Sequence, residues 1–465
     1  MEKVVERLGR FASELSLERI PQEVIEKGKT CLLNGIGIGL SCFRMDTSKA
    51  ARGLIKQYEK GPDKGATLLG DGSKVSMMGA AFANGVMFHS RGQEDTHGTM
   101  HIGTTVIPTA LAVAEWKKSS GKDLLAAVIA GYEVAAAIGK EFTPLTTPRG
   151  FRASPIYGVF GSATAAGKLL RLNPAQMAAA LSYAAAFASG TLEPFLAGTM
   201  EIFFENGLAN RNGILAALIA QTGMSGAPSA MEGPLGFCQA FTGQRDNPDL
   251  IGAEIGQTWE IRNVFFKPYA TCAFNQSPVT AVMNLIQKHD LKAEQVERIH
   301  IRMNSYEANY PGNKYTGPFA TFLQTIMSTA FGMAVPILER KLLFSDLWRF
   351  DDPGINALCR LTTVEADDQL PPLNVVLAVQ LKGGQTLQEE LRVSPDYYFY
   401  DYDRDIHLIT GIHQEMRVPK HVTASLIDQI REVEKWKSVD RFVRSLTFKT
   451  EKKNSLAQKG KKGAK

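Results

Sequence analysis

The sequence predicts a mainly α-helical fold with a smaller α+β domain inserted near the C-terminal end of the chain. Apolar residues recur every three or four positions from Val4 to about residue 257, which is the spacing of helices that bury one face. Alternation with a period of two, typical of strands, is confined to about 258–395, and helical spacing returns after Lys420. We therefore expect a large helical domain made from both chain ends, residues 1–265 and 400–450, and an α+β domain of residues 266–399.

Helices account for the whole first half of the chain. Apolar spacing predicts two helices between Val4 and Leu33, the second with Pro21 in its first turn. The other expected helices are Met77–Phe88, Val106–Trp116 with Pro108 in its first turn, Ala126–Ile138, Ser162–Leu170, Pro174–Ser189 and Gly213–Gln221, with breaks at Thr143-Pro144 and Asn173-Pro174. Several of these segments are rich in Ala and Gly and apolar on every side, so we place them in the middle of the helical domain.

The second half carries every expected strand. The strand-like segments are Thr258–Tyr269, Glu297–Met303 and a hairpin of Asn374–Leu381 and Leu387–Val393 that turns at Gly383-Gly384. Helices are expected at Ser277–His289 and over Thr321–Leu342.

Composition and charge exclude several classes of protein. The chain has 465 residues and a net charge of +5, and the segment 451–465 alone holds six lysines and one glutamate, which equals that charge. The basic character therefore belongs to an expected disordered tail and not to a nucleic-acid-binding surface. Five cysteines without C-x-x-C spacing indicate reduced thiols, and the sequence shows no apolar signal core and no membrane span, so a cytoplasmic protein is expected.

The linker between two expected helices, His89–Pro108, gathers most of the candidate chemistry. It reads H-S-R-G-Q-E-D-T-H-G-T-M-H-I-G-T-T-V-I-P and holds three of the eight histidines of the chain together with Glu94 and Asp95. Imidazoles and carboxylates suit proton transfer near neutral pH. An ordinary connection whose histidines are solvated or cap helix ends is the alternative.

Motifs over nearly the whole chain resemble the MmgE/PrpD family of 2-methylcitrate dehydratases and cis-aconitate decarboxylases. The motifs are A-A-F-A-N-G leading to E-D-T-H, H-I-G-T-T-V-I-P, A-G-Y-E-V, G-F-R-A-S-P-I-Y-G-V-F-G, G-L-A-N-R-N-G-I-L-A-A-L-I-A and F-K-P-Y-A-T-C. The resemblance implies a helical domain with a lid-like α+β domain and a substrate pocket between them. It also implies a homodimer that needs no metal or organic cofactor. Family members remove a proton next to a carboxylate of a small di- or tricarboxylate and then lose water or carbon dioxide, and a smaller set epimerises.

The match to the family pattern is partial. In the family's D-F-D-D-T the last two residues are kept as Asp95 and Thr96, whereas the first Asp is replaced by Gly92. Arg152 stands where G-F-H-P-T-G-T-F-G has its histidine, and in T-K-x-x-H-x-G-x-A the lysine is Ile202 and the histidine Glu205. His101 and Lys267 match the family's histidine and lysine, although the loop before His101 is about one residue shorter.

The resemblance and the chemistry together assign candidate roles. His101 is the expected base, because a pKa of about 6.5 leaves an imidazole largely neutral at pH 7. Asp95 would orient His101 or bind substrate, and Lys267 would hold a carboxylate. The remaining candidates are His97 as an alternative acid or base, and Thr96, Arg152, Tyr157, His89, Glu205 and Cys272 as contacts of the substrate.

Several of these residues have a structural alternative. Asp95 with Thr96 would cap the helix that follows. Arg152 would pair with Glu141 or Glu205, and Cys272 would be a small buried apolar side chain and not a nucleophile.

Three functions follow. The first is a cofactor-independent lyase acting on a small hydroxy or unsaturated carboxylic acid. The second is an isomerase or epimerase that uses the same base, and the third is a non-catalytic descendant that binds a ligand. Because Ile202 and Glu205 make the expected pocket less positive, we expect a substrate that is less anionic or more apolar than a citrate-type acid.

Overall fold

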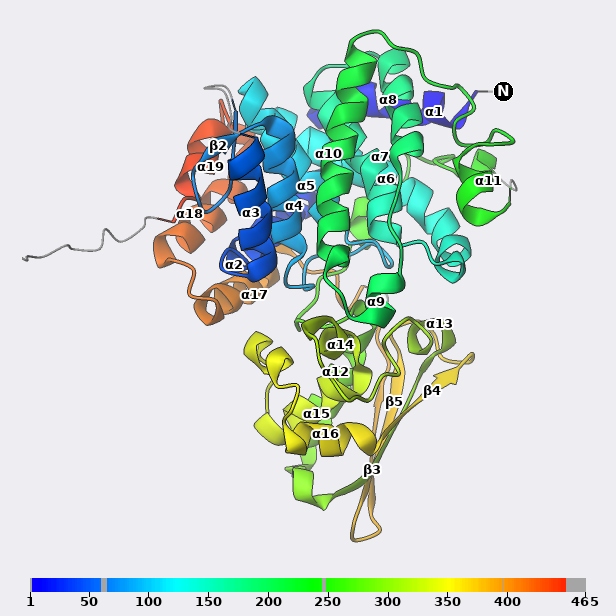
Figure 1. Cartoon of the computed structure of the whole chain (residues 1–465), viewed down its shortest axis with the longest axis vertical. Helices are drawn as coiled ribbons and strands as arrows, with labels where there is room; N and C mark the ends of the chain where they lie inside the picture. Colours follow the sequence, from blue (N-terminus) through cyan, green and yellow to red (C-terminus); the bar gives the residue numbers. More distant parts are fainter. Residues whose placement is uncertain (1, 60–64, 245–247, 395, 449–465) are drawn as a thin grey trace, which may run out of the picture.

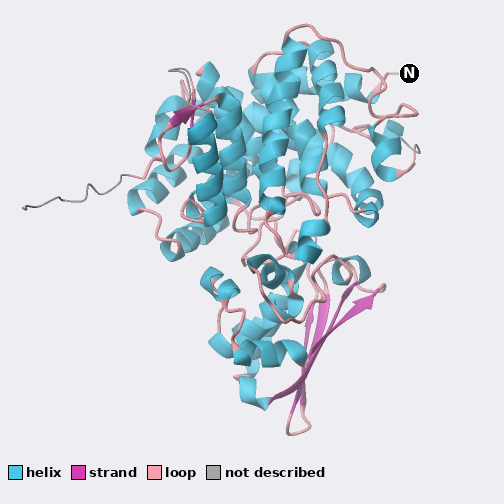
Figure 2. Ribbon diagram, viewed as in Figure 1, coloured by secondary structure: helices cyan, strands magenta, loops and turns pink. Residues whose placement is uncertain are grey.

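The structure confirms a mainly α-helical protein with a smaller α+β domain. It is a computed structural model that describes residues 2–59, 65–244, 248–394 and 396–448, so the basic segment 451–465 lies outside the described residues. Figure 1 shows the N-terminal helices and the C-terminal helices together in one helical domain, with the α+β domain below it. Figure 2 shows helices throughout the upper part and the larger sheet along one side of the lower part.

The helical domain is formed by both ends of the chain. Its N-terminal helices are α1 Val4–Glu14, α2 Gln22–Ser41, α3 Asp46–Tyr58, α4 Met77–His89, α5 Ile102–Lys117, α6 Gly121–Thr146, α7 Ala153–Leu169, α8 Pro174–Phe187, α9 Glu193–Ala197, α10 Glu201–Gln221 and α11 Phe237–Thr242. Its C-terminal helices are α17 Tyr402–Glu415, α18 Lys420–Arg431 and α19 Asp440–Ser445. No helix among the described residues is long and apolar enough to cross a membrane.

Small residues let the central helices approach closely, as their composition predicts. A Cβ atom at Gly161 of α7 would lie 2.8 Å from the carbonyl oxygen of Gly131 in α6, so the two backbones are in direct contact. The buried helices α4 to α7 and α10 pack around such close contacts. This packing holds the ends of the helices, which carry polar side chains, in fixed positions.

Helix α5 begins earlier than predicted. Pro108, which was expected in its first turn, lies inside the helix. A proline leaves the carbonyl four residues before it without its helical partner. Asn210 of α10 compensates: its side-chain amide donates to the carbonyl of Thr104 at 2.8 Å and accepts from the backbone N–H of Thr109 at 3.2 Å. A tertiary contact thus extends the helix back to Ile102, directly after His101. The break predicted at Thr143-Pro144 is also wrong, since α6 continues to Thr146.

The strand predicted over Thr258–Tyr269 is a short 3-10 helix, Glu260–Asn263, followed by one bridge between Phe265 and Thr96. The carboxylate of Glu133 in α6 accepts from the backbone N–H groups of Glu260 and Ile261, both at 2.9 Å, and so stabilises the turn. The prediction that all strands follow residue 258 is also wrong. Two short strands, β1 Ala66–Thr67 and β2 Lys74–Val75, pair within the helical domain.

The larger sheet has the order β4-β3-β5-β6. Its strands are β3 Val296–Asn304, β4 Thr362–Asp367, β5 Val375–Leu381 and β6 Thr386–Leu391. The predicted hairpin is β5–β6, and β4, which the sequence analysis missed, is a largely exposed edge strand parallel to β3. The helices of this domain are α12 Gln276–His289, α13 Ser305–Ala308, α14 Phe322–Met327, α15 Thr329–Glu339 and α16 Pro353–Arg360.

A buried polar pair joins the two chain ends inside the helical domain. The side-chain amide of Asn34 in α2 donates to Asp405 Oδ1 in α17 at 2.7 Å. Asn34 Oδ1 and Asp405 Oδ2 are buried and have no partner among the described residues. Burial raises the pKa of Asp405 to about 8, so at neutral pH its carboxyl is largely protonated. The protonated carboxyl can donate, which an ionised one cannot.

We predict that Asp405→Asn stabilises the protein at alkaline pH. The pKa of about 8 in the folded state lies above the usual aspartate value, so ionisation of Asp405 lowers the free energy of unfolding as the pH rises from about 4 to 8. Asparagine keeps a donor without that charge. Urea unfolding should show little difference at pH 5 and a gain of about 1–3 kcal/mol at pH 9. The exposed variant Asp403→Asn serves as control, and an equal fall of stability with pH in wild type and Asp405→Asn would contradict the prediction.

Candidate active site

A cavity lies between the helical domain and the α+β domain, at the loop that joins α4 to α5. Its volume is about 40 Å³, enough for only a few water molecules. Most of its surface is apolar, with two imidazoles and two threonines among the lining side chains. The lining residues are His89, Gly92, Thr96, Thr99, His101, Phe195, Ile202, Phe203, Cys272, Ala273, Phe274, Tyr310, Leu323, Ile326 and Met327.

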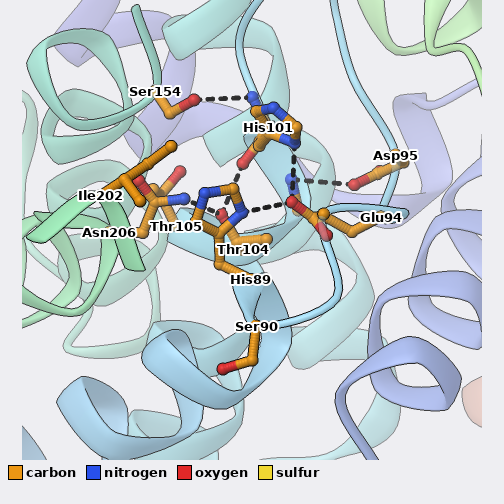
Figure 3. Close-up of polar contacts among 12 residues, drawn as sticks. His89, Ser90, Glu94, Asp95, His101, Thr104, Thr105, Ser154, Ile202 and Asn206 are labelled. Atoms are coloured by element: carbon orange, nitrogen blue, oxygen red, sulfur yellow. Dashed lines mark hydrogen bonds and ion pairs between the residues drawn. The ribbon is translucent and has the colours of Figure 1, made fainter. Parts of the chain in front are cut away.

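The buried carboxylate of Glu94 connects the two imidazoles. Glu94 Oε1 lies 2.6 Å from His101 Nδ1 and also contacts His89 Nδ1, as Figure 3 shows. Burial alone would raise the pKa of Glu94, but His89, His101 and the ammonium of Lys267 outweigh that effect and hold this pKa well below its usual range. Glu94 is therefore ionised, and each imidazole can donate a proton to it.

Hydrogen bonds determine which nitrogen of each imidazole carries a proton. The guanidinium of Arg152 lies 2.5 Å from His89 Nε2, and because a guanidinium only donates, that nitrogen must accept. His89 therefore carries its proton on Nδ1. The same reasoning places a proton of His101 on Nδ1, facing Glu94, and leaves His101 Nε2 as a free acceptor.

The backbone around His101 is held on both sides. Its N–H donates to Ser154 Oγ of α7 at 3.0 Å, and its carbonyl accepts from the hydroxyl of Thr104 at 2.7 Å (Figure 3). Burial is the main cause that lowers the pKa of His101 well below the ordinary imidazole value, and the positive charge of Lys267 adds to it. His101 is thus a neutral imidazole with an oriented ring, as a general base requires.

Two cations lie beside the imidazoles. The ammonium of Lys267 is fully buried, donates to the carbonyl of Gly92 and lies 3.4 Å from His101 Nδ1. Burial lowers the pKa of Lys267, and the charge of Glu94 opposes that shift. Arg152 Nη1 donates to the carbonyl of Ile202 at 2.7 Å and forms an ion pair with Glu205 Oε2 at 3.0 Å. The charge of Arg152 is therefore already compensated.

The structure brings only part of the predicted set together. His101, His89, Thr96 and Cys272 line the cavity, and Lys267 and Arg152 contact its imidazoles. The Oγ1 atom of Thr96 is buried with no partner among the described residues, so its hydroxyl is available to a ligand.

Asp95 does not lie at the cavity, contrary to its predicted role. It accepts from the hydroxyl of Tyr132 at 2.7 Å and from the backbone N–H of Gly103 at 3.1 Å. Its carboxylate thus binds the start of α5, and no contact drawn in Figure 3 joins it to either imidazole. This geometry agrees with the alternative interpretation, in which Asp95 caps the helix that follows.

Three other predicted residues lie outside the cavity lining. His97 Nε2 lies 3.0 Å from Glu260 Oε2, next to α6. The hydroxyl of Tyr157 lies 2.8 Å from the hydroxyl of Thr146 within the helical core. Glu205 pairs with Arg152 and also accepts from a backbone N–H. The pairing of Glu205 with Arg152 is one of the structural alternatives that the sequence offered, whereas the partners of His97 and Tyr157 were not predicted.

The sequence analysis missed the role of Glu94 as the carboxylate between the histidines. Glu94 and Asp95 are neighbours in the chain, and only the direction of the folded loop decides which of them faces the cavity. The apolar wall from α14, formed by Leu323, Ile326 and Met327, was also missed, because such residues in a helix indicate an ordinary core.

The nitrogen atoms of His89 and His101 and an oxygen of Glu94 lie within 4.8 Å of one another, as the ligands of a divalent cation would. Lys267 lies 3.4 Å from one of these nitrogens, and Arg152 is bonded to the other imidazole. A divalent cation here would be repelled by both positive charges. The arrangement is better suited to moving protons than to binding a metal.

The chain is similar over most of its length to fungal decarboxylases. It is 28% identical over 389 residues to a cis-aconitate decarboxylase of Aspergillus terreus, with 79% of each chain covered. A second cis-aconitate decarboxylase, from Aspergillus terreus strain NIH 2624, is 27% identical over 75% of this chain and 74% of its own. The cis-aconitate decarboxylase-like protein oryM of Aspergillus oryzae is 27% identical over 57% of this chain and 58% of its own.

Two family models match consecutive parts of the chain. Residues 6–249 match the MmgE/PrpD N-terminal domain, and residues 269–395 match the MmgE/PrpD C-terminal domain. Together these matches cover most of the helical domain and nearly all of the α+β domain. The chain therefore belongs to the MmgE/PrpD family.

Proposed function

We propose that the protein is a lyase that acts on a small hydroxy or unsaturated carboxylic acid and uses His101 as its base. The observation that carries the proposal is the fixed imidazole of His101, held by Glu94 and lying beside Lys267 at an apolar cavity. The names of the relatives support a lyase and give no support to the isomerase alternative.

The geometry supports a simple sequence of steps. His101 Nε2 removes the proton next to the carboxylate, and the C–H electron pair passes into the adjoining carboxylate as an enolate. Glu94 stabilises the imidazolium that forms, while the positive charge of Lys267 and the hydroxyl of Thr96 stabilise the enolate. The enolate then expels hydroxide from the neighbouring carbon, and the imidazolium gives its proton to that hydroxide, so water leaves and His101 becomes neutral again. In a decarboxylation no proton is removed first: the electron pair of the C–CO₂ bond stays on the substrate as carbon dioxide leaves, and His101, protonated from solvent, delivers the proton that replaces carbon dioxide.

The charges around the cavity favour an acid with few carboxylates. Arg152 is compensated by Glu205, and a substrate anion would have to share the charge of Lys267 with Glu94. The wall opposite is apolar and includes Ile202, Phe203 and Ile326. An additional carboxylate buried against that wall would cost several kcal/mol. We therefore propose a monocarboxylate or an alkyl-substituted acid as the substrate.

Substitution of His101 and Glu94 tests the proposed base. A screen of carboxylic acids in deuterium oxide, followed by proton NMR, would identify an acid that is turned over. With that acid, His101→Asn should lower kcat by about 10²–10⁴-fold with little change in KM. Glu94→Gln should lower kcat as well and should move the acidic limb of the kcat/KM profile to lower pH, because the imidazolium loses its counter-charge.

The wild-type profile provides an independent check. Because the pKa of His101 is lowered, the base stays unprotonated well below pH 6.5, and kcat/KM should remain level across that pH. Full activity of His101→Asn would contradict the proposal that His101 is the base, whereas absence of turnover with every acid in the screen would favour the non-catalytic alternative. The variant His97→Asn, outside the cavity, is the matched control.

Substrate preference gives a second prediction. Turnover of cis-aconitate and of 2-methylcitrate should be poor, with kcat/KM below about 10⁴ M⁻¹ s⁻¹, because each brings several carboxylates to a site where Arg152 is paired with Glu205 and Lys267 also balances Glu94. A coupled or NMR assay with both acids measures this directly. Efficient turnover of either acid would refute the proposed substrate class while leaving the base intact.

We also propose that the chain forms a homodimer through α3 and α10. Tyr58 of α3 is 72% exposed and Leu208 of α10 is 43% exposed, and an ion pair joins Arg211 of α10 to Glu59, the residue directly after α3. A second copy would remove these apolar side chains from water. Sedimentation velocity should show a dimer that dissociates in the double variant Tyr58→Glu, Leu208→Glu. A wild-type monomer at micromolar concentration would contradict the proposal.

A further inference from the structure

A second pocket adjoins the cavity on the side away from His101. Its volume is about 320 Å³, against about 40 Å³ for the cavity itself. Its walls come from both domains: Leu196 belongs to α9 of the helical domain, and Asn309, Pro311 and Tyr315 belong to the segment after α13. Figure 1 shows α9 at the lower end of the helical domain, near α13 and α14. We call this space the outer pocket.

Two aromatic rings form the boundary between the cavity and the outer pocket. Phe195 and Tyr310 line both spaces, and their ring centroids lie 5.9 Å apart in an edge-to-face arrangement. These two side chains are thus common to the walls of both spaces. The hydroxyl of Tyr310 makes no hydrogen bond to any described residue, so rotation of its ring breaks none. A small movement of these rings would join the two spaces.

The outer pocket is mainly apolar and is open to solvent at its far side. Leu196 is 64% exposed there, although it is a large apolar side chain. The polar groups of the pocket are already occupied in part: the ammonium of Lys314 donates to Asn309 Oδ1 at 2.7 Å, and Gln324 Oε1 accepts from a backbone N–H at 2.8 Å. This surface is suited to a hydrocarbon chain.

We propose that the outer pocket binds a linear aliphatic chain of the substrate acid, which passes between Phe195 and Tyr310 from a carboxylate held in the cavity beside Lys267. This inference rests on the proposed function, because it places the acid group in the cavity. It also accounts for the size of the cavity, which holds the reacting end of such an acid but little more. The shared boundary of the two spaces, formed by Phe195 and Tyr310, carries the proposal.

Binding of simple saturated acids tests the proposal without knowledge of the substrate. Isothermal titration calorimetry of the full chain with butanoate, hexanoate and octanoate should show an affinity that rises with chain length. Each methylene that becomes buried should contribute about fourfold, so octanoate should bind at least about tenfold more tightly than butanoate. Competition between butanoate and octanoate should be complete, because both place a carboxylate at the same position.

Two variants fill the outer pocket from opposite walls. Leu196→Trp and Asn309→Trp should each remove the advantage of octanoate and leave butanoate binding within about twofold of wild type. Leu235→Trp is the matched control, since Leu235 is 94% exposed and lines neither space. Equal affinities for butanoate and octanoate, or an unchanged octanoate advantage in both filling variants, would overturn the inference and leave the proposed function standing. If no acid of any length binds, the inference fails, and turnover in the screen of carboxylic acids decides separately whether the proposed function stands.

Discussion

The candidate site depends on one buried carboxylate. Removing the Glu94 side chain from water costs several kcal/mol unless positive charge and donors compensate it. Two imidazole N–H groups and the nearby ammonium of Lys267 supply this compensation. Lys267 in turn is anchored by the carbonyl of Gly92, within the same loop as Glu94. The loop, the two histidines and the lysine therefore stabilise one another, and each would be unfavourable in its position without the others.

This mutual dependence extends to the neighbouring helices. Arg152 at the start of α7 fixes the tautomer of His89, and Glu205 of α10 compensates the charge of Arg152. Arg152 and Glu205 both stand where the family motifs have histidine. Because the two side chains form an ion pair, these two departures are coupled, although they are 53 positions apart in the chain. Considered separately, one adds a positive charge and the other a negative charge to the pocket. Considered as an ion pair, they leave the net charge of the cavity almost unchanged, and Ile202 accounts for the remaining loss of positive charge.

The sequence predicted the features that depend on local spacing. Helical periodicity predicted most of the helices, and two glycines between alternating segments predicted the β5–β6 hairpin, because these patterns are set by neighbours in the chain. The errors occur where a distant side chain decides. Asn210 supplies the hydrogen bonds that keep Pro108 inside α5, and Glu133 turns a strand-like segment into a 3-10 helix. Likewise, Tyr132 decides which of Glu94 and Asp95 faces the cavity. Its hydroxyl donates to Asp95 and holds that carboxylate at the start of α5.

Burial makes the charge of Glu94 unfavourable, and it also makes the site selective for the number of carboxylates on the substrate. In a cavity with an apolar wall and room for few water molecules, a charge interacts far more strongly than it does in water. The ammonium of Lys267, which also balances Glu94, can then hold one carboxylate, whereas a second carboxylate has neither solvent nor a cation to stabilise it. Selectivity for the number of carboxylates therefore follows from the balance of buried charges and does not require a specific contact to each substrate atom. The cavity is enclosed by two domains, so the balance of buried charges is complete only when the domains are in contact. Lys267 lies at the junction between the domains. Contact between the domains is therefore a condition for holding the substrate anion.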